Sequence, residues 1–129
     1  MRIISGILKA RRFSVPKNFP SRPTTDFAKE GLFNILNNWV DFDELDVLDL
    51  FCGTGNISFE FVSRGAESVT CVDASAKCAA FVKSTFAELK FESGTIIKAD
   101  ALRFTETAKK KWNLVFADPP YSYEQYPKL

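Results

Sequence analysis

The sequence predicts an α/β protein with a mostly parallel sheet, covered by helices that connect its strands. Short apolar segments rich in Val, Ile, Leu and Phe recur along the chain from residue 47 onward. Strand and helix patterns alternate at intervals of roughly 20 to 25 residues, and a glycine-rich turn follows the first strand. This alternation is typical of right-handed crossovers in a doubly wound sheet.

Length and composition agree with one globular domain, because the 129 residues are 46% hydrophobic and 26% charged. No apolar run approaches the roughly 18 residues of a membrane helix, and Lys9, Arg11 and Arg12 interrupt the start before a signal-peptide core can form. We therefore expect a soluble, cytoplasmic protein with no membrane partner. With three cysteines and no histidine, the usual zinc spacings and histidine-based catalysis are excluded, and we expect no metal site.

The net charge of +1 averages two unlike segments. Residues 1–25 carry six basic and no acidic residues, whereas the remaining 104 carry 11 basic and 16 acidic residues. We expect residues 1–22 to form a basic RNA-binding extension, folded as a short hairpin that turns at Gly6 and projects as an appendage. A basic terminus that is merely solvated remains the alternative. The candidate RNA-binding residues are Arg2, Lys9, Arg11, Arg12 and Arg22.

The second predicted domain covers residues 23–129. Helix-start residues lie at 23–26, and an apolar face follows at helical spacing, formed by Ala28, Leu32, Ile35, Leu36 and Trp39. Strands are predicted at 47–51, 68–72, 95–97 and 114–117. Helices are predicted from about Ile57 to Arg64 and from about Ala76 to Leu89.

Ligands in such sheets bind at the carboxyl ends of the strands. The first strand ends in a run that includes Asp49, Phe51, Gly53 and Gly55, and its two glycines allow the backbone to turn tightly and approach a ligand. Ser58 stands where a dinucleotide site would have a third glycine, so NAD binding is disfavoured. A tight turn without a ligand remains the alternative.

The next two strand ends carry further acceptors. Asp73 follows the second strand, where a carboxylate can accept hydrogen bonds from a ribose diol, and Asp100 with Ala101 follows the third, where an adenine amino group can bind. Phosphate-bearing cofactors favour basic residues near the turn, and none is present. Together these positions predict a cofactor that contains adenosine. Individually, Asp73 could instead cap a helix and Asp100 could be a loop carboxylate.

The fourth strand end reads Asp118-Pro119-Pro120-Tyr121. Prolines cannot donate hydrogen bonds, so the Asp118 carboxylate and the Pro119 carbonyl form an acceptor-only site. Such a pair can orient the two N–H donors of an exocyclic base amine or a side-chain amide, and Tyr121 offers a ring for stacking.

These motifs resemble a known family. Asp49-x-Phe51-x-Gly53-x-Gly55 followed by Asp118-Pro119-Pro120-Tyr121 resembles class I S-adenosylmethionine-dependent methyltransferases that act on exocyclic amines. The N-terminal residues 1–6, 9–12 and 22–26, with Glu30-x-x-Phe33-Asn34, are similar to the RsmD family of 16S ribosomal RNA guanine-N2 methyltransferases. The resemblance covers essentially the whole chain.

The resemblance implies a Rossmann-like fold, S-adenosylmethionine as cofactor, and 16S rRNA or the 30S subunit as partner. It implies that Asp49, Gly53 and Gly55 line the methionine part of the cofactor, Asp73 its ribose, and Asp100 and Ala101 its adenine, with Phe51 as a further cofactor-binding residue. Asp118 and Pro119 would hold the guanine amine and Tyr121 would stack on the base. Two alternatives remain: another acceptor (adenine N6, cytosine N4 or a protein amide), or an inactive RNA-binding assembly factor.

The same class is expected to have seven strands in the order 3-2-1-4-5-7-6, whereas the chain ends soon after the fourth. We therefore expect a C-terminally incomplete domain: a fragment, the ordered part of a longer protein, or a chain whose edge is covered by another. The strand at 114–117 would then lie at an exposed edge.

Overall fold

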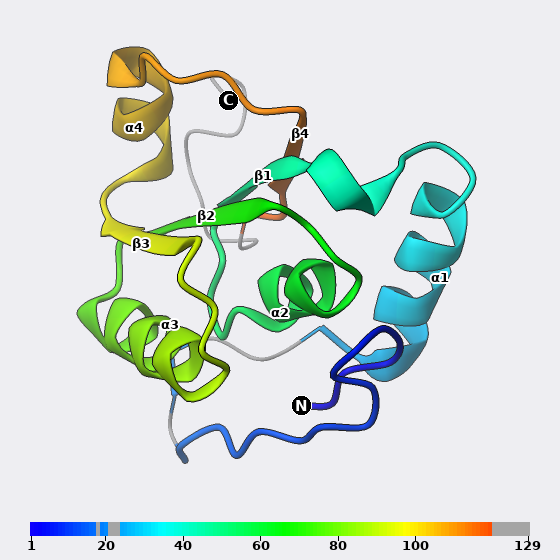
Figure 1. The fold of residues 1–129 in the computed structure, drawn as a ribbon. Helices are drawn as coiled ribbons and strands as arrows, with labels where there is room; N and C mark the ends of the chain where they lie inside the picture. Colours follow the sequence, from blue (N-terminus) through cyan, green and yellow to red (C-terminus); the bar gives the residue numbers. More distant parts are fainter. Residues whose placement is uncertain (18, 21–23, 120–129) are drawn as a thin grey trace.

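The computed structural model describes residues 1–17, 19–20 and 24–119. Its sheet consists of four parallel strands, β1 (Asp46–Leu50), β2 (Ser68–Asp73), β3 (Gly94–Lys98) and β4 (Leu114–Ala117), in the order β3-β2-β1-β4 (Figure 1). The predicted strands and their parallel order are confirmed in this part of the chain. All four carboxyl ends consequently meet at one edge of the sheet.

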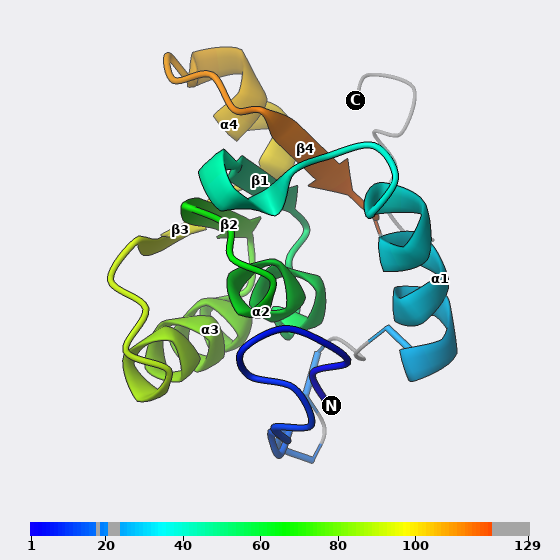
Figure 2. The same ribbon diagram turned by 45° about the vertical axis from the view of Figure 1, so that its right-hand side comes forward.

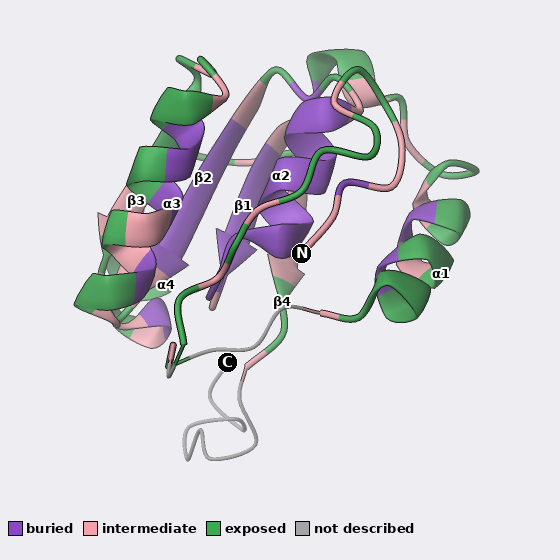
Figure 3. Ribbon diagram, turned by 90° about the horizontal axis from the view of Figure 1, so that it is seen from below, coloured by how far each residue is buried: buried purple, intermediate pink, exposed green. Residues whose placement is uncertain are grey.

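Helices cover both faces unequally. Helices α1 (Asp26–Leu36), α2 (Asn56–Ser63) and α3 (Ala76–Glu88) stand on one face, and the short α4 (Ala101–Thr107) covers part of the other (Figures 1 and 3). Every residue of α2 is buried, as its uniform purple colour in Figure 3 shows. The sheet covers one side of α2 and the N-terminal segment covers the other, so α2 is the centre of the main core.

The N-terminal arm, defined here as residues 1–17 and 19–20, begins as the predicted hairpin. Arg2 and Arg12 form an antiparallel bridge, and the Ile3 amide donates to the Arg11 carbonyl at 2.9 Å. The expectation of an appendage is wrong, because Ile3 is only 2% exposed and its hairpin lies against α2 (Figure 2). At Gly6, whose φ is +91°, an added Cβ would lie 2.0 Å from the Ser63 carbonyl oxygen.

Helix α1 is present, but the side of the helix that faces the core differs from the predicted one. Of the expected face, Ala28, Ile35 and Trp39 are exposed, whereas Lys29 and Phe33 are completely buried. The buried face includes a lysine, so a search for apolar residues at helical spacing does not find it. Burial of this lysine requires acidic partners that are distant in sequence.

Helix α4 is not predicted from the sequence. Asp100 caps it, accepting from the Arg103 amide at 3.2 Å, and Phe104 packs against Trp112 with ring centroids 5.8 Å apart. Two turns are too short to show a helical period, so packing against the sheet determines this helix. A short 3-10 helix, η1 (Phe42–Glu44), precedes β1.

Strand β4 lies at the edge of the described sheet, as expected. Leu114 and Phe116 pack into the main core, while Val115 on the opposite face is 55% exposed. No helix in the described part of the chain is long and apolar enough to cross a membrane.

Candidate cofactor pocket

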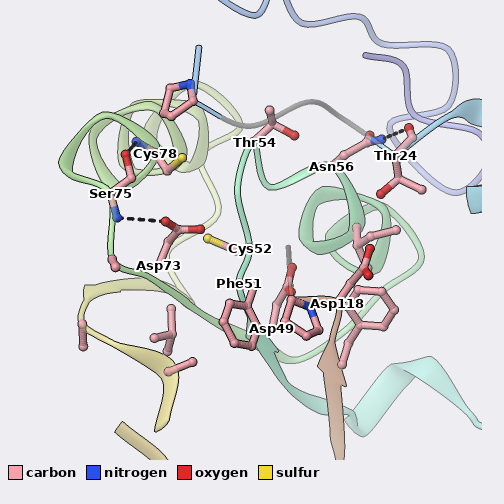
Figure 4. A pocket seen from close by; sticks show the side chains of 18 of the residues that line it. Thr24, Asp49, Phe51, Cys52, Thr54, Asn56, Asp73, Ser75, Cys78 and Asp118 are labelled. Carbon is pink, nitrogen blue, oxygen red and sulfur yellow. Dashed lines mark hydrogen bonds between the residues drawn. The ribbon is translucent and has the colours of Figure 1, made fainter. Parts of the chain in front are cut away.

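A cavity of about 850 Å³ opens at the carboxyl ends of the strands (Figure 4). This volume is within the range of about 300–1,000 Å³ that is usual for small-molecule sites. Seven of the predicted site residues line it: Asp49, Phe51, Asp73, Asp100, Ala101, Asp118 and Pro119. The topology thus brings together side chains from four separate strand ends.

The turn between β1 and α2 contributes Phe51, Cys52 and Thr54 to the cavity lining. Phe51, Gly53 and Gly55 all adopt positive φ, at 58°, 55° and 81°. An added Cβ at Gly55 would lie 2.7 Å from the Phe59 ring, so only glycine fits at this position. The two glycines are not among the residues that line the cavity. Their observed role is to let the chain reverse direction between the strand and the helix.

Asp73 fixes this turn to the end of β2. One carboxylate oxygen accepts from the Gly53 amide at 2.9 Å, and the other accepts from the Ser75 amide at 2.9 Å (Figure 4). Each oxygen keeps further acceptor capacity toward the cavity, because a carboxylate oxygen can accept more than one hydrogen bond. Asp73 is therefore a turn-organising residue as well as a candidate ligand for a diol.

Asp49 is buried beneath the turn and is only 1% exposed. Its carboxylate accepts from the Ser58 hydroxyl at 2.6 Å, and Ser58 in turn accepts from the Cys71 thiol at 3.1 Å. Burial raises the pKa of Asp49 from 3.8 to about 7; the Ser58 hydrogen bond opposes the rise and the charges of Asp73 and Asp118 add to it. The site therefore holds a carboxyl group that a nearby cation would ionise.

Two cysteines lie in the cavity wall. A hydrogen bond with Cys71 and burial raise the pKa of the Cys52 thiol, and burial also raises the pKa of Cys78. Thiols with raised pKa values remain protonated and are poor nucleophiles. All three cysteines are free, so they form no disulfide in this fold.

The third and fourth strand ends complete the wall. Asp100 is the N-cap of α4 rather than a loop carboxylate, and it also borders the cavity beside the buried Ala101. Asp118 is exposed, and no donor in the described chain forms a hydrogen bond with its carboxylate. Tyr121 and Arg22 lie outside the described residues.

The lining has a distinctive charge. Asp49, Asp73, Asp100 and Asp118 line the cavity, and no Lys or Arg among the described residues does. A phosphate-bearing dinucleotide would meet four carboxyl groups here, whereas a cationic ligand without phosphate is electrostatically favoured. Within the described ranges, no group of three or more His, Cys, Asp or Glu residues is arranged to hold a metal ion.

The structure also shows a buried ionic cluster that the sequence does not reveal. Lys29 and Glu60 have fully buried side chains 3.2 Å apart, and Arg64 donates to Glu60 at 2.8 Å. Glu60 also accepts from the Ile4 and Ser5 amides of the arm, at 2.8 and 3.0 Å. Burial alone would raise the pKa of Glu60, but these hydrogen bonds and cations lower it. Burial lowers the pKa of Lys29, against the opposing effect of Glu60.

Asn56 connects this cluster to the cavity. Its side-chain oxygen accepts from Lys29 at 2.8 Å, and its side-chain nitrogen donates to the Thr24 carbonyl at 2.7 Å (Figure 4). Both Asn56 and Thr24 line the cavity, and Lys29 also donates to the Arg2 carbonyl. The arm and the cavity wall are therefore held by the same ammonium group. The only local signal of this cluster is a charged residue four positions before the buried Phe33.

The candidate RNA-binding cations are not equivalent. Arg2 is paired with Asp26 at 3.1 Å, and Arg11 lies 3.8 Å from Glu88. Lys9 and Arg12 are exposed and have no ion-pair partner in the described part of the chain.

Comparisons with known proteins agree with this geometry. The chain is 32% identical over 121 residues to the ribosomal RNA small subunit methyltransferase D of Buchnera aphidicola subsp. Baizongia pistaciae, covering 94% of this chain and 61% of that protein. It is 35% identical over 133 residues to the putative rRNA methyltransferase YlbH of Bacillus subtilis, covering 100% of this chain and 71% of the relative. The chain thus spans about three fifths of the Buchnera relative.

A solved structure of the putative methyltransferase yhhF from Escherichia coli has the same fold, with a TM-score of 0.87 and 30% identity. The similarity covers 99% of this chain and 68% of that one. The fold is accordingly the Rossmann-like fold of class I methyltransferases. All 129 residues match the family model described as conserved hypothetical protein 95, and the chain therefore belongs to that family, the RsmD family.

Proposed function

We propose that this protein transfers a methyl group from S-adenosylmethionine to the exocyclic N2 amine of a guanine in 16S rRNA of the small ribosomal subunit. The observation that carries the proposal is that four carboxyl groups, including the acceptor Asp118, line one cavity. No Lys or Arg among the described residues lines it, so a ligand with phosphate groups is disfavoured. The names of the relatives, ribosomal RNA small subunit methyltransferase D among them, support RNA as the substrate.

The hydrogen-bond acceptors that line the cavity suit this cofactor. When bound, S-adenosylmethionine supplies a methyl group on a positively charged sulfur. Asp73 would accept hydrogen bonds from the ribose, and Asp100 with Ala101 would border the adenine. Asp49 lies near the glycine turn, where its carboxyl group would face the methionine part and its cationic amine. Phe51, beside Asp49, adds an apolar wall.

Asp118 and Pro119 would handle the amine of the target base. The lone pair of guanine N2 is delocalised into the ring, and hydrogen bonds from its protons to fixed acceptors help to localise it. The Asp118 carboxylate provides one acceptor at the cavity, and Pro119 brings its carbonyl to the same strand end. Orientation takes the place of a strong base, so this step needs no histidine. We also assign Tyr121 to stacking on the base.

The arm would contribute to RNA binding. We assign residues 1–22 to the RNA-binding extension; of its candidate residues, Lys9 and Arg12 have no ion-pair partner in the described part of the chain. Neutralising phosphates with such cations releases counterions, so binding should weaken as salt rises. A substrate in the small ribosomal subunit also implies that the protein acts in the cytoplasm.

Two measurements test the proposal. Calorimetry with S-adenosylhomocysteine measures the cofactor site independently of activity. Transfer of labelled methyl groups to 30S particles that lack the modification, followed by nucleoside analysis, identifies the acceptor. We expect N2-methylguanosine; label in adenine N6, cytosine N4 or protein would overturn the assigned acceptor, and no cofactor binding would support an inactive assembly factor instead.

The Asp118→Ala variant tests the assigned role of this residue. We expect transfer to fall by about 10²-fold or more, the scale seen when one oriented hydrogen-bonding group is removed from an active site. Affinity for S-adenosylhomocysteine should be nearly unchanged, because the side chain is exposed and forms no hydrogen bond with another described residue that would organise the cavity. A variant that transfers methyl groups at the normal rate would show that the amine is held elsewhere.

A further inference from the structure

A second hollow of about 440 Å³ lies between the N-terminal arm and α3. We call it the arm–α3 groove. The arm forms one wall, and the outward side of α3 forms the other. It is lined by Pro16, Lys17, Phe19, Lys77, Ala80, Phe81 and Ser84.

The groove adjoins the cofactor pocket but is separate from it. Phe19 lines the groove, whereas its neighbour Pro20 lines the pocket. In the first turn of α3, Lys77 lines the groove and Cys78 lines the pocket. On both sides, residues that are adjacent in sequence line different cavities, so the backbone of the arm and that of α3 run between the groove and the pocket. A polymer that reaches into the pocket past the arm would pass next to the groove.

The lining combines free cations with aromatic rings. Lys17 and Lys77 are exposed; among the described residues, no Asp or Glu lines the groove and neither ammonium group has an ion-pair partner. Arg2 and Arg11, by contrast, already contact carboxylates. The rings of Phe19 and Phe81 meet edge to face with centroids 5.3 Å apart.

This combination matches single-stranded nucleic acid. Proteins bind single strands with a positively charged groove that follows the phosphates and with aromatic side chains on which bases stack. An apolar protein segment would bury the two ammonium groups without a counter-charge, which is unfavourable. An acidic peptide would use the lysines but leave the rings without planar partners.

We propose that the arm–α3 groove binds one nucleotide of a single-stranded RNA segment that flanks the methylated base. Phe19 and Phe81 provide the stacking surface, and Lys17 and Lys77 contact the phosphates on either side. The inference rests on the proposed RNA substrate and adds a binding site outside the pocket.

The test compares two lysines of the same helix. Lys77 lines the groove, whereas Lys83 is also exposed on α3 but does not line it. Binding of a labelled single-stranded RNA of about 12 nucleotides is measured by fluorescence anisotropy over a series of salt concentrations. Lys77→Gln should weaken binding and reduce the slope of log K against log salt by about 0.7, the value for one phosphate contact in a single strand. Lys83→Gln should leave both unchanged.

The aromatic contribution is tested with Phe81→Leu, which keeps an apolar side chain at this half-buried position. We expect affinity to fall at least about fivefold without a change in salt slope, because stacking is not ionic. Circular dichroism and thermal unfolding identify a variant that has lost its fold, and Lys77→Gln then decides the question by itself.

The results separate this inference from the proposed function. Equal effects of Lys77→Gln and Lys83→Gln, or no RNA binding by the parent chain, would overturn the groove assignment, even where S-adenosylhomocysteine binds normally. Groove-specific RNA binding without cofactor binding would support the groove and contradict the methyltransferase proposal.

Discussion

Asp49→Asn should remove a pH dependence of stability that the fold itself creates. The carboxyl group of Asp49 is buried, and its pKa rises from 3.8 to about 7. At about 1.36 kcal/mol per pKa unit, this rise corresponds to about 4 kcal/mol in the free energy of unfolding. Asparagine has nearly the same shape, can still accept from Ser58, and does not titrate.

The direction of the effect follows from proton binding. Between pH 3.8 and about 7 the folded protein binds more protons at Asp49 than the unfolded chain does. The free energy of unfolding therefore falls as the pH rises through this window. The stabilising contribution is complete below pH 3.8 and is lost above about pH 7. Glu60 acts in the opposite direction, because its pKa is lowered, so the parent protein alone does not isolate Asp49.

Urea unfolding of parent and variant at about pH 5 and about pH 8 isolates the group. About two units of the window lie between pH 5 and pH 7, so the difference in unfolding free energy between parent and variant should change by about 3 kcal/mol. The free energy of unfolding of the variant, relative to that of the parent, should be higher at about pH 8 than at about pH 5. Parallel pH profiles would refute the reasoning and would mean that Asp49 ionises normally in the folded protein.

Three further substitutions test the arm and the turn. Lys29→Met should lower the free energy of unfolding by about 3–5 kcal/mol, because it leaves the Glu60 carboxylate buried with one cation fewer; urea unfolding measures this, and a loss below about 1 kcal/mol would contradict it. Gly55→Ala should cost about 2–4 kcal/mol by the same assay, from its positive φ and the contact with Phe59. Its control is Gly31→Ala in α1, where an added Cβ meets nothing within 4 Å and should stabilise the helix by about 0.5–1 kcal/mol; equal effects at the two glycines would disprove the steric argument.

The Lys29 cluster gives the arm a second role besides charge. Lys29 binds the Arg2 carbonyl of the arm, Glu60 of α2 and Asn56 of the cavity wall. Since Asn56 also holds the Thr24 carbonyl at the cavity, displacement of the arm would disturb that wall. Removing one partner of a buried ion pair leaves an uncompensated charge, so the cluster favours one docked position of the arm.

The sequence by itself determined the sheet and the positions of its strand ends. The strand segments 47–51 and 68–72 are largely buried and rich in apolar residues, with Asp49, Ser68 and Thr70 as their polar positions. Because parallel strands place their carboxyl ends at one edge, the strand pattern alone is enough to group Asp49, Asp73 and Asp118, and all three line the cavity.

Only the tertiary structure decided how the helices and the arm pack on this sheet. The predicted face of α1 omitted Lys29 because a local hydrophobic pattern treats a charged residue as exposed. Its burial depends on Glu60, which lies 31 positions later in the chain, and on the Arg2 carbonyl. The raised pKa of Asp49 likewise comes from burial under the turn, a property of the packed fold. Periodicity reports local preference, whereas desolvation and ion pairing depend on residues that only folding brings together.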